Sequence, residues 1–395
     1  MMKIVVVGIG GYGEIVLNGL FANPDNLDFT IEGYVAPRPK DNDYSKKLHE
    51  MGAQRYVTLE EFFEQKHADL AVISSPIEFH MPQTILCLSK NTAVMCEKPV
   101  AGTIQDAYAM KQAEDASNAF VGIGYQWSYS DAIINLKKDI LNGIYGQPVR
   151  LKNIVLWPRT QRYFKRNSWA GKVKNESGYW ILDSVANNAT AHYIHNMFFV
   201  LGDSLKSSAW PKTIQANIYR ANDIENYDTC VSRIITQKGV EILYYASHST
   251  DTKCEPLLNF QFEKGEIYAD FNKEKCIYGK IGDKIISYGN PFDVEMKKVF
   301  DCIRTIKGED VNYCPIEAAI PQLKTINAIS QYYDIEQVPE AKLGYLEAEE
   351  NTTKLVYVKG LYEEMMTAYK DNKILNESSE VIDITGYNHF ENIKQ

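Results

Sequence analysis

The sequence predicts a doubly wound α/β domain with a parallel sheet, followed by an α+β domain with a large, mostly antiparallel open sheet. A run of branched apolar residues at 4–7 breaks into a glycine-rich turn, and strand and helix patterns then alternate as far as residue 125. A strand-rich stretch follows between 214 and 288. Alternating strands and helices are typical of parallel sheets, whereas consecutive strands favour antiparallel ones.

The elements of the first domain, residues 1–125, follow in order. We expect strands at 4–7, 31–36, 70–74, 93–96 and 120–125, and helices at 14–21, 58–65, 82–90 and 104–117. Right-handed crossovers make such strands parallel and bring their carboxyl ends to one crevice.

The second domain is expected over residues 126–351. It begins with a helix at 131–142 and has another after Asp183, then the strands, and then helices at 294–306 and 316–333. A tail at 352–395 holds one expected helix near 359–369.

The glycine-rich turn predicts a dinucleotide site. Gly8, Gly10 and Gly13 have the G-x-G-x-x-G spacing, which permits a tight turn, a close backbone approach to pyrophosphate and close packing of the next helix. Gly11 and Tyr12 lie within the same turn and complete the expected Rossmann contacts. The alternative interpretation is a tight structural turn.

Composition limits the class of protein. A chain of 395 residues fits two domains, and a net charge of −9 argues against nucleic-acid or membrane-surface partners. Seven cysteines without a C-x-x-C pair argue against a disulfide framework or structural zinc and favour a cytoplasmic protein. No apolar run reaches membrane-spanning length, and the first residues lead directly into a strand, so we expect no signal peptide.

Four ordered segments make a family resemblance specific. They are GIGGYG at 8–13, SSPIEFH at 74–80, EKPVAGT at 97–103 and NGIYGQPV at 142–149. The chain resembles the Gfo/Idh/MocA family of NAD(P)-dependent oxidoreductases over residues 3–202, and more weakly to about 335. The resemblance implies a Rossmann domain, a second domain whose open sheet often forms a homo-oligomer interface, and oxidation or reduction of a sugar, cyclitol or polyol hydroxyl carbon.

The residues agree with that reading. Lys98 follows the 93–96 strand, so it lies at the sheet edge where nicotinamide and substrate would meet, and a lysine there can exchange a proton with the reacting oxygen. Glu97 would fix the turn or contact a ribose hydroxyl. The alternative is that Lys98 is a solvated loop lysine. At the preceding strand end, Ser75 and Pro76 are expected to contact the cofactor, whereas His80 is as well explained by a structural role.

The end of the second strand favours NADP over NAD, although only slightly. NAD-preferring Rossmann domains often place an acidic residue there, but here Pro37 occupies that place and Arg38 follows. A guanidinium can hold a 2′-phosphate with two hydrogen bonds. Arginine also occurs beside the acid in NAD-using relatives, so NAD stays open.

The family pattern in the second domain has an aspartate followed four residues later by a histidine. Counting forward puts Asp183 and Asn187 in these places, whereas counting back from Leu201 puts Asn188 and His192 there. The second count keeps an imidazole, so we expect His192 as acid/base partner of Lys98, Asn188 orienting substrate and Asp183 supporting. Asp183 could instead cap a helix. His195 is expected to be structural, and no metal is expected.

An aromatic and basic stretch at 157–174 is the expected substrate wall. Flat rings suit sugars and guanidinium groups suit hydroxyls or a carboxylate, so the substrate is polar and possibly anionic. Its candidate residues are Arg162, Tyr163, Arg166 and Trp169, with Tyr125 and Trp127 beside them. A solvated loop edge is the alternative for any single residue.

Three functions are therefore compared. The first is a dehydrogenase that transfers hydride between the nicotinamide and a hydroxyl carbon. The second is a redox-neutral glycoside hydrolase or lyase with tightly bound NAD, and the third is a non-catalytic cofactor sensor, against which the intact Glu-Lys-Pro sequence argues.

Overall fold

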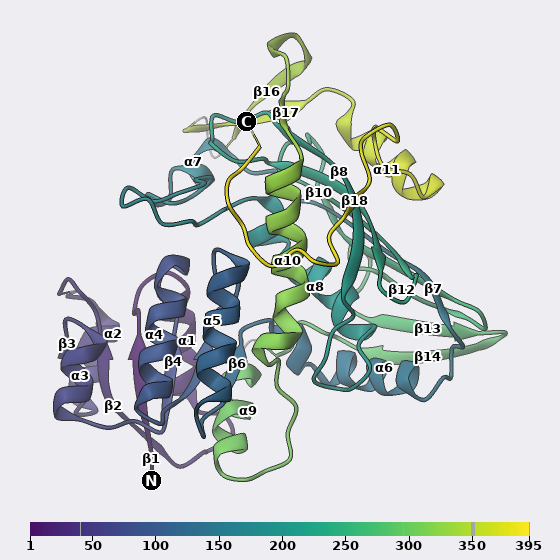
Figure 1. Cartoon of the computed structure of the whole chain (residues 1–395). Helices are drawn as coiled ribbons and strands as arrows, with labels where there is room; N and C mark the ends of the chain where they lie inside the picture. The colour runs from purple at the N-terminus through teal and green to yellow at the C-terminus, as the bar shows by residue number, and fades with distance from the viewer. Residues whose placement is uncertain (40, 295, 349–351, 395) are drawn as a thin grey trace. The chain divides into compact units, whose positions relative to one another are not determined.

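The computed structural model describes residues 1–39, 41–294, 296–348 and 352–394 (Figure 1). The chain forms two compact units. Unit 1 comprises residues 1–101, 105–130 and 294–320, and unit 2 comprises 102–104, 131–293 and the residues from 321 onward. A parallel sheet in unit 1 and a mostly antiparallel one in unit 2 confirm the predicted fold class.

The sheet of unit 1 has six parallel strands in the order β3-β2-β1-β4-β5-β6. They are β1 (Met2–Val7), β2 (Phe29–Val35), β3 (Gln54–Tyr56), β4 (Leu70–Ile73), β5 (Ala93–Cys96) and β6 (Val121–Ile123). The strand order reverses between β1 and β4, which is where ligands bind in open α/β sheets.

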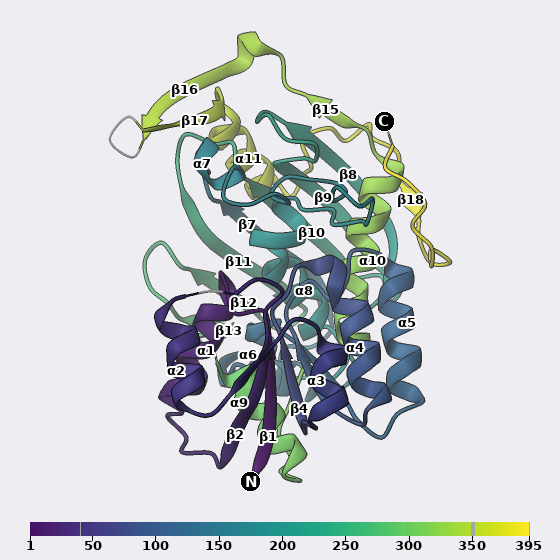
Figure 2. The ribbon, with the colours of Figure 1, turned by 90° about the vertical axis from the view of Figure 1, so that its left-hand side faces the viewer.

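Helices cover both faces of this sheet (Figure 2). They are α1 (Tyr12–Ala22), α2 (Asp43–Glu50), α3 (Leu59–Gln65), α4 (His80–Ser89), α5 (Ile104–Asp115) and α9 (Lys297–Ile306), with short 3₁₀ turns η1 (Ile77–Phe79) and η2 (Gln126–Tyr129). The apolar sides of α1, α2 and α9 share one core with the inward side chains of β1, β2, β4 and β5.

The sequence reading missed α2 and β3. Both are short and polar, DYSKKLHE and QRY, so neither has an apolar run. A capping box between Asn42 and Ser45 starts α2 instead, because each residue's side chain bonds the other's backbone N–H.

Helix α9 belongs to unit 1, although the sequence reading placed it in the second domain. Its buried residues Val299, Phe300 and Ile303 join the core of the parallel sheet, which removes the apolar face of the helix from water. The helix starts at Lys297 rather than 294, and Glu295, within the expected range, lies outside the described residues. The first unit also extends to Ser130 rather than ending at 125.

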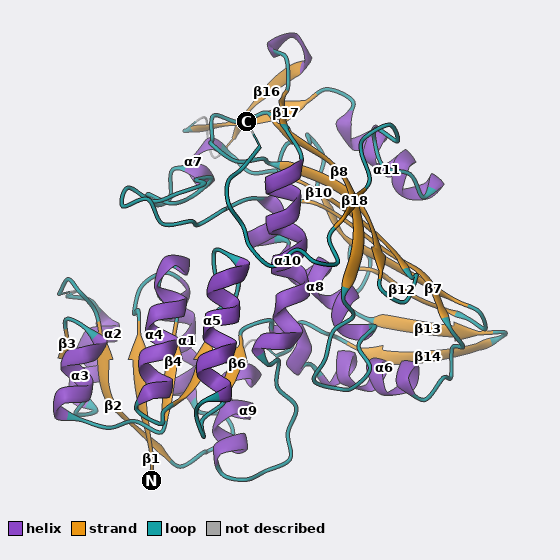
Figure 3. Cartoon of the chain, viewed as in Figure 1, coloured by secondary structure: helices purple, strands orange, loops and turns teal. Residues whose placement is uncertain are grey.

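Unit 2 contains a ten-stranded sheet in the order β14-β13-β12-β11-β7-β10-β9-β8-β15, with β18 pairing to β8 (Figure 3). The strands are β7 (Pro148–Leu156), β8 (Pro211–Arg220), β9 (Thr229–Thr236), β10 (Glu241–Ser247), β11 (Cys254–Phe262), β12 (Glu266–Asp270), β13 (Ile277–Ile281), β14 (Lys284–Gly289), β15 (Ile335–Gln337) and β18 (Ile382–Asp383). Only the β7–β10 and β8–β15 pairs are parallel among these.

Helices pack on both faces of this sheet. Strand β10 shows this, because its successive side chains point to opposite faces and contact different helices. Leu243 and Tyr245 contact α11, whereas the Tyr244 hydroxyl lies 2.5 Å from Thr190 Oγ1 on the opposite side. The helices outside unit 1 are α6 (Asp131–Leu141), α7 (Gln161–Phe164), the π-helix η3 (Val185–Ala189), α8 (Ala191–Val200), η4 (Glu340–Lys342) and α11 (Leu361–Asp371). Helix α10 (Ile316–Tyr332) begins in unit 1 and continues in unit 2.

A two-stranded hairpin of β16 (Leu343–Ala348) and β17 (Thr353–Val358) follows. The boundary expected between 351 and 352 falls between these paired strands, so it would divide one hairpin; Asn351 itself lies outside the described residues. In the described ranges, no helix has the length and apolar character needed to cross a membrane.

Candidate dinucleotide and substrate site

The glycine turn between β1 and α1 has the backbone that a pyrophosphate site requires. Gly8 and Gly11 have φ of +86° and +59°, a region that glycine enters without strain. A Cβ at Gly13 would lie 2.3 Å from the Gly8 carbonyl oxygen, so only glycine lets α1 begin this close to the strand.

The N-terminus of α1 is accessible. Gly11 is its N-cap, and no side chain in the described part of the chain caps it. Gly11 is exposed, and Gly10 and Tyr12 are half-buried. The first N–H groups of a helix lack intrahelical partners and favour phosphate. These residues therefore fit the pyrophosphate of a dinucleotide.

The Glu-Lys-Pro turn follows β5 and is anchored by a buried lysine from α9. Lys298 Nζ lies 2.5 Å from Glu97 Oε1 and donates to the Tyr12 hydroxyl at 3.0 Å. Glu97 is buried, while Lys98 is half-buried at the carboxyl edge of the sheet. The sequence reading missed Lys298, because nothing in the sequence distinguishes it from a surface lysine. Only the packing of α9 encloses its side chain.

His80 is enclosed and holds two loops together. Its Nδ1 lies 2.9 Å from the Pro99 carbonyl oxygen, and its Nε2 lies 3.0 Å from that of Ser75. Burial lowers the pKa of His80, against the opposing effect of the two carbonyls. The sequence left open whether His80 is structural or contacts the cofactor, and this geometry favours the structural role. Ser75 and Pro76 keep exposed surface, so their assignment to the cofactor stays a prediction.

Two arginines lie at the end of β2. Arg38 is exposed, as a 2′-phosphate ligand must be. Arg55 on β3 donates from Nε to the Ala36 carbonyl at 3.0 Å and from Nη2 to the Pro37 carbonyl at 3.1 Å. Arg55 was missed by the sequence reading, since only the pairing of β2 with β3 brings it here.

Tyr125 and Trp127 are core residues rather than parts of a substrate wall. Tyr125 is fully buried and Trp127 is 2% exposed, so neither ring presents a face to a ligand in this structure. Gln126, between them, stays half-buried, and its Oε1 accepts a 3.4 Å hydrogen bond from Tyr12. This corrects the assignment of the two rings to the substrate wall, because both rings are buried and aromatic composition alone does not distinguish a core ring from a surface ring.

In unit 2, the polar residues at the start of α8 are arranged around Asp183. Asp183 is buried and accepts from the Gly171 N–H at 2.6 Å and from Asn188 Nδ2 at 2.8 Å. Within residues 181–200, only Asn188, Ala189 and His192 keep partial exposure. Asn187 is fully enclosed and donates to the Leu182 carbonyl. The exposed surface therefore favours the count that selects Asn188 and His192.

The segment over which the two counts differ changes its helix type. It starts as the π-helix η3, which contains wider turns than an α-helix, and changes to α8 at Ala191. The simple i, i+4 relationship expected for Asn188 and His192 therefore crosses the junction of two helix types.

His195 is a core residue. Its ring stacks on Phe199, and burial together with the nearby Lys137 lowers the pKa of His195 to about 3. The Lys137 ammonium is itself buried over Phe199 and donates to the Ser207 carbonyl at 2.6 Å. The structural role expected for His195 agrees with this geometry. Among described residues, no group of three His, Cys, Asp or Glu side chains is placed to hold a metal ion.

The 157–174 stretch forms an alternating stack of rings and guanidinium groups. Arg159 lies 5.5 Å from the Trp157 ring centre and 4.9 Å from that of Tyr163. Arg166 lies 3.7 Å from the Tyr163 ring and 5.0 Å from that of Trp169. We call these five residues the arginine–aromatic stack.

The stack rests on His248, which the sequence reading missed. His248 Nδ1 lies 2.8 Å from the Trp157 carbonyl, and its ring packs edge-on to Tyr163. Burial, reinforced by Arg159, lowers the pKa of His248 to about 3. Arg162 is not part of the stack, because it lines a separate cavity of about 580 Å³ with Lys165 and Glu347.

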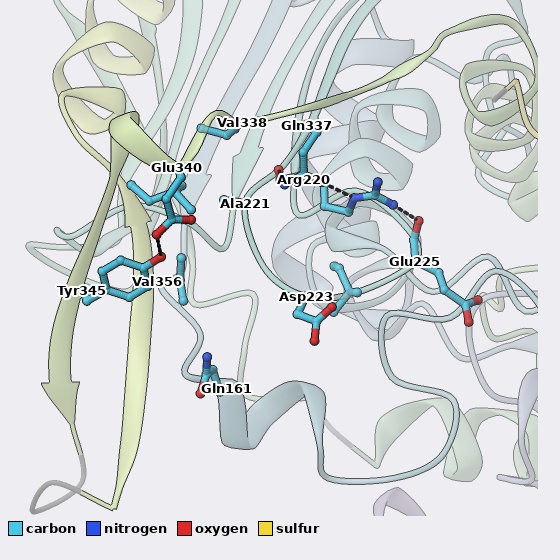
Figure 4. Close-up of a pocket in the computed structure, with 12 residues that line it drawn as sticks. Gln161, Arg220, Ala221, Asp223, Glu225, Gln337, Val338, Glu340, Tyr345 and Val356 are labelled. Atoms are coloured by element: carbon cyan, nitrogen blue, oxygen red, sulfur yellow. Dashed lines mark hydrogen bonds between the residues drawn. The ribbon is translucent and has the colours of Figure 1, made fainter.

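Another cavity of unit 2, of about 470 Å³, lies between the β16–β17 hairpin and the 220–225 loop (Figure 4). Tyr345 donates to Glu340 at 2.6 Å on the hairpin side, and Arg220 donates to Gln337 and to the Glu225 carbonyl on the other. None of the residues selected from the sequence lines this cavity.

The fold and the glycine turn define a dinucleotide-binding Rossmann protein. Residues 2–125 match the model of an oxidoreductase family with an NAD-binding Rossmann fold. This match confirms, for residues 2–125, the resemblance to the Gfo/Idh/MocA oxidoreductase family inferred from the motifs.

Two curated relatives match the N-terminal part. Inositol 2-dehydrogenase of Rubrobacter xylanophilus is 28% identical over 148 residues, 36% of this chain and 41% of the relative. The scyllo-inositol 2-dehydrogenase (NADP(+)) of Bacillus subtilis is 24% identical over 139 residues, 35% of this chain and 38% of the relative. The chain thus spans less than half the length of these relatives.

A solved structure matches more of the chain. The WlbA dehydrogenase of Chromobacterium violaceum, in complex with NADH and UDP-GlcNAcA, has a TM-score of 0.67 at 19% identity, covering 83% of this chain and 92% of that one. Similarity at this level of identity shows a common fold.

Proposed function

We propose that this protein is an NAD(P)-dependent oxidoreductase that acts on a hydroxyl carbon of a sugar, cyclitol or related polyol. The observation that carries the proposal is the joint presence, in unit 1, of an uncapped glycine turn and of Lys98 at the carboxyl edge of the same parallel sheet. The naming of two relatives as inositol dehydrogenases supports the substrate class.

The bound nicotinamide supplies the hydride acceptor or donor. Lys98 hydrogen-bonds the reacting hydroxyl and exchanges its proton, since a positioned general acid or base lowers this barrier. His192 is the second proton-transfer group, because it is the imidazole of α8 that keeps exposed surface. Asn188 orients the substrate hydroxyls, and Asp183 fixes its amide.

The arginine–aromatic stack supports a polar, anionic substrate. The Trp169 ring suits the apolar face of a sugar, and Arg166 is exposed between it and Tyr163. A guanidinium that stacks on a ring still has its N–H edge free for a carboxylate. A uronic acid or similar acidic sugar fits these groups better than a neutral polyol.

For the cofactor, we favour NADP over NAD by a small margin. The arginine pair at the end of β2 supports this choice, because Arg38 is exposed there and Arg55 adds a second positive charge. A relative that is named for NADP shows that the family accommodates it.

The test combines binding with turnover. The purified protein is titrated with NADH and NADPH by fluorescence, and then incubated with oxidised cofactor and a panel of inositols, neutral sugars, uronic acids and aryl glycosides. We expect reduced cofactor to appear in proportion to oxidised substrate. Release of an aryl leaving group without net reduction would instead show the redox-neutral reaction, and binding without either reaction would show a cofactor sensor.

A further inference from the structure

Lys298 is a buried cation of unit 1 that no step of the proposed reaction uses. Its side chain is fully enclosed, whereas that of its partner Glu97 is 9% exposed. Lys298 therefore cannot touch a ligand itself, and any effect it has must act through Glu97 and Tyr12.

Both partners belong to the elements that would hold a dinucleotide. Tyr12 is the first residue of α1, directly after the glycine turn, and Glu97 directly precedes Lys98. Lys298 Nζ lies within 3.0 Å of the Tyr12 hydroxyl, over whose ring it also lies at 4.5 Å. One ammonium thus joins the two loops on either side of the β1/β4 switch point.

The space around Glu97 is built for its carboxylate. A Cβ at Gly124 would lie 2.8 Å from Glu97 Oε2, while Oε1 lies against Lys298. Glycine at 124 thus leaves room for one carboxylate oxygen, and the buried ammonium of Lys298 holds the other. A fixed carboxylate at this edge can accept hydrogen bonds from ribose hydroxyls.

The other cations of α9 have different ion-pair partners. Lys297 pairs with Asp301 at 2.6 Å, and Arg304 pairs with Asp301 and Asp25. A fully buried ion pair is poor evidence of stabilisation, because desolvation offsets the attraction. Lys298 is thus better explained by placement of the cofactor loops than by stability.

We propose that Lys298 is a positioning residue of the dinucleotide site. It holds the Glu97 carboxylate and the Tyr12 hydroxyl in place for the ribose next to the nicotinamide. It also neutralises the charge of Glu97 beside the pyrophosphate. This rests on the proposed function, since it assumes that a dinucleotide binds at the glycine turn. Because the adenosine 2′ position lies elsewhere, the effect is the same for both cofactors.

The experiment measures the Kd for NADH and NADPH and the melting temperature of each variant. Lys298→Met removes the charge but keeps the length of the side chain, and Lys297→Met is the matched control on the same helix. We expect Lys298→Met to raise both Kd values by about tenfold, the usual effect of losing one charge-assisted hydrogen bond, and Lys297→Met to leave them unchanged.

A second pair of variants separates placement from folding. The double variant Glu97→Gln with Lys298→Met contains no unpaired charge, so we expect it to bind more tightly than Lys298→Met alone. Tyr12→Phe removes only the hydroxyl that Lys298 bonds, and we expect a rise of a few-fold in both Kd values; this variant decides the matter if Lys298→Met does not fold.

Unchanged Kd values in Lys298→Met and Tyr12→Phe, with a lower melting temperature alone, would overturn the proposal and leave Lys298 as a structural residue. If the unaltered protein binds neither dinucleotide, the proposed function fails instead. The two failures are therefore distinct.

Discussion

Asn188 Nδ2 donates a hydrogen bond to Asp183 Oδ1 across 2.8 Å. These are the two residues that alternative counts along the sequence assign to one family position. The fold therefore uses both, with the buried carboxylate holding the half-buried amide. The relationship predicts that Asp183 acts on the reaction through Asn188.

Asp183→Asn tests this relationship. The variant loses one acceptor, either toward the Gly171 N–H or toward Asn188, so we expect kcat to fall about tenfold, as for one charged hydrogen bond. Steady-state kinetics measure it, and Asp203→Asn on the exposed surface is the control. A kcat equal to that of the unaltered protein would show that Asp183 does not affect the reaction.

Lys98→Ala is expected to remove most turnover while leaving dinucleotide affinity nearly intact. Loss of a general acid or base typically costs roughly 10²- to 10⁴-fold in rate. Turnover is followed by cofactor absorbance and affinity by fluorescence, and the exposed Lys90→Ala is the matched lysine control. Retained turnover would exclude Lys98 from proton transfer.

Arg38→Ala is expected to weaken NADPH binding far more than NADH binding. A charged hydrogen bond to phosphate contributes about 1.5–3 kcal/mol, and only NADPH carries the 2′-phosphate. Parallel fluorescence titrations give both Kd values, so NADH acts as the control within the same variant. Equal losses for both cofactors would remove the case for a phosphate clamp at this position.

Glycine substitutions should rank by the space at each position. Gly13→Ala forces a Cβ to within 2.3 Å of the Gly8 carbonyl oxygen, so we expect loss of dinucleotide binding and a clear fall in melting temperature. Gly11→Ala meets no atom but has a φ of +59°, which costs about 1 kcal/mol. Gly386→Ala, in open space, should change neither quantity. Calorimetry and titration check the order.

The buried histidines predict loss of stability in acid. The pKa of His195 is lowered to about 3 from 6.5 by burial, so the unfolded chain binds a proton that the folded chain refuses between these values. The free energy of unfolding therefore falls as the pH drops below about 6.5, by up to about 1.4 kcal/mol per pH unit for this histidine.

His195→Phe removes this group and keeps a ring against Phe199. We expect its free energy of unfolding, from urea titrations at pH 7, 6 and 5, to fall less steeply than that of the unaltered protein. The exposed His389→Phe is the control. Identical slopes for His195→Phe and the unaltered protein would show that His195 is protonated in the folded state.

Much of unit 1 could be predicted because its determinants are local. The buried strand at 4–7, the glycine spacing and the Glu-Lys-Pro turn each lie within a few residues, and short-range sterics decide their conformation. Helix α2 and strand β3 could not, since a capping pair and edge pairing stabilise them instead of an apolar pattern.

The candidate site divides in the same way. The sequence selected Lys98 from its motif and Asn188 and His192 from their spacing, but it left open whether Asn187 or His192 takes the family histidine position. That choice depends on exposure, which the π-helix η3 decides. Tyr125 and Trp127 appeared as wall residues because aromatic composition does not distinguish a core ring from a surface ring.

By itself, the amino-acid sequence determined the Rossmann unit, its glycine turn and the family resemblance of residues 2–125, because these follow from backbone preferences and from motifs that are contiguous in the chain. Only the tertiary structure decided that α9 returns to unit 1, that Lys298 pairs with Glu97 and Tyr12, and that Arg55 joins Arg38 at the end of β2. Those contacts join residues far apart in the chain, and burial of an apolar helix face or the register of a strand pair brings them together.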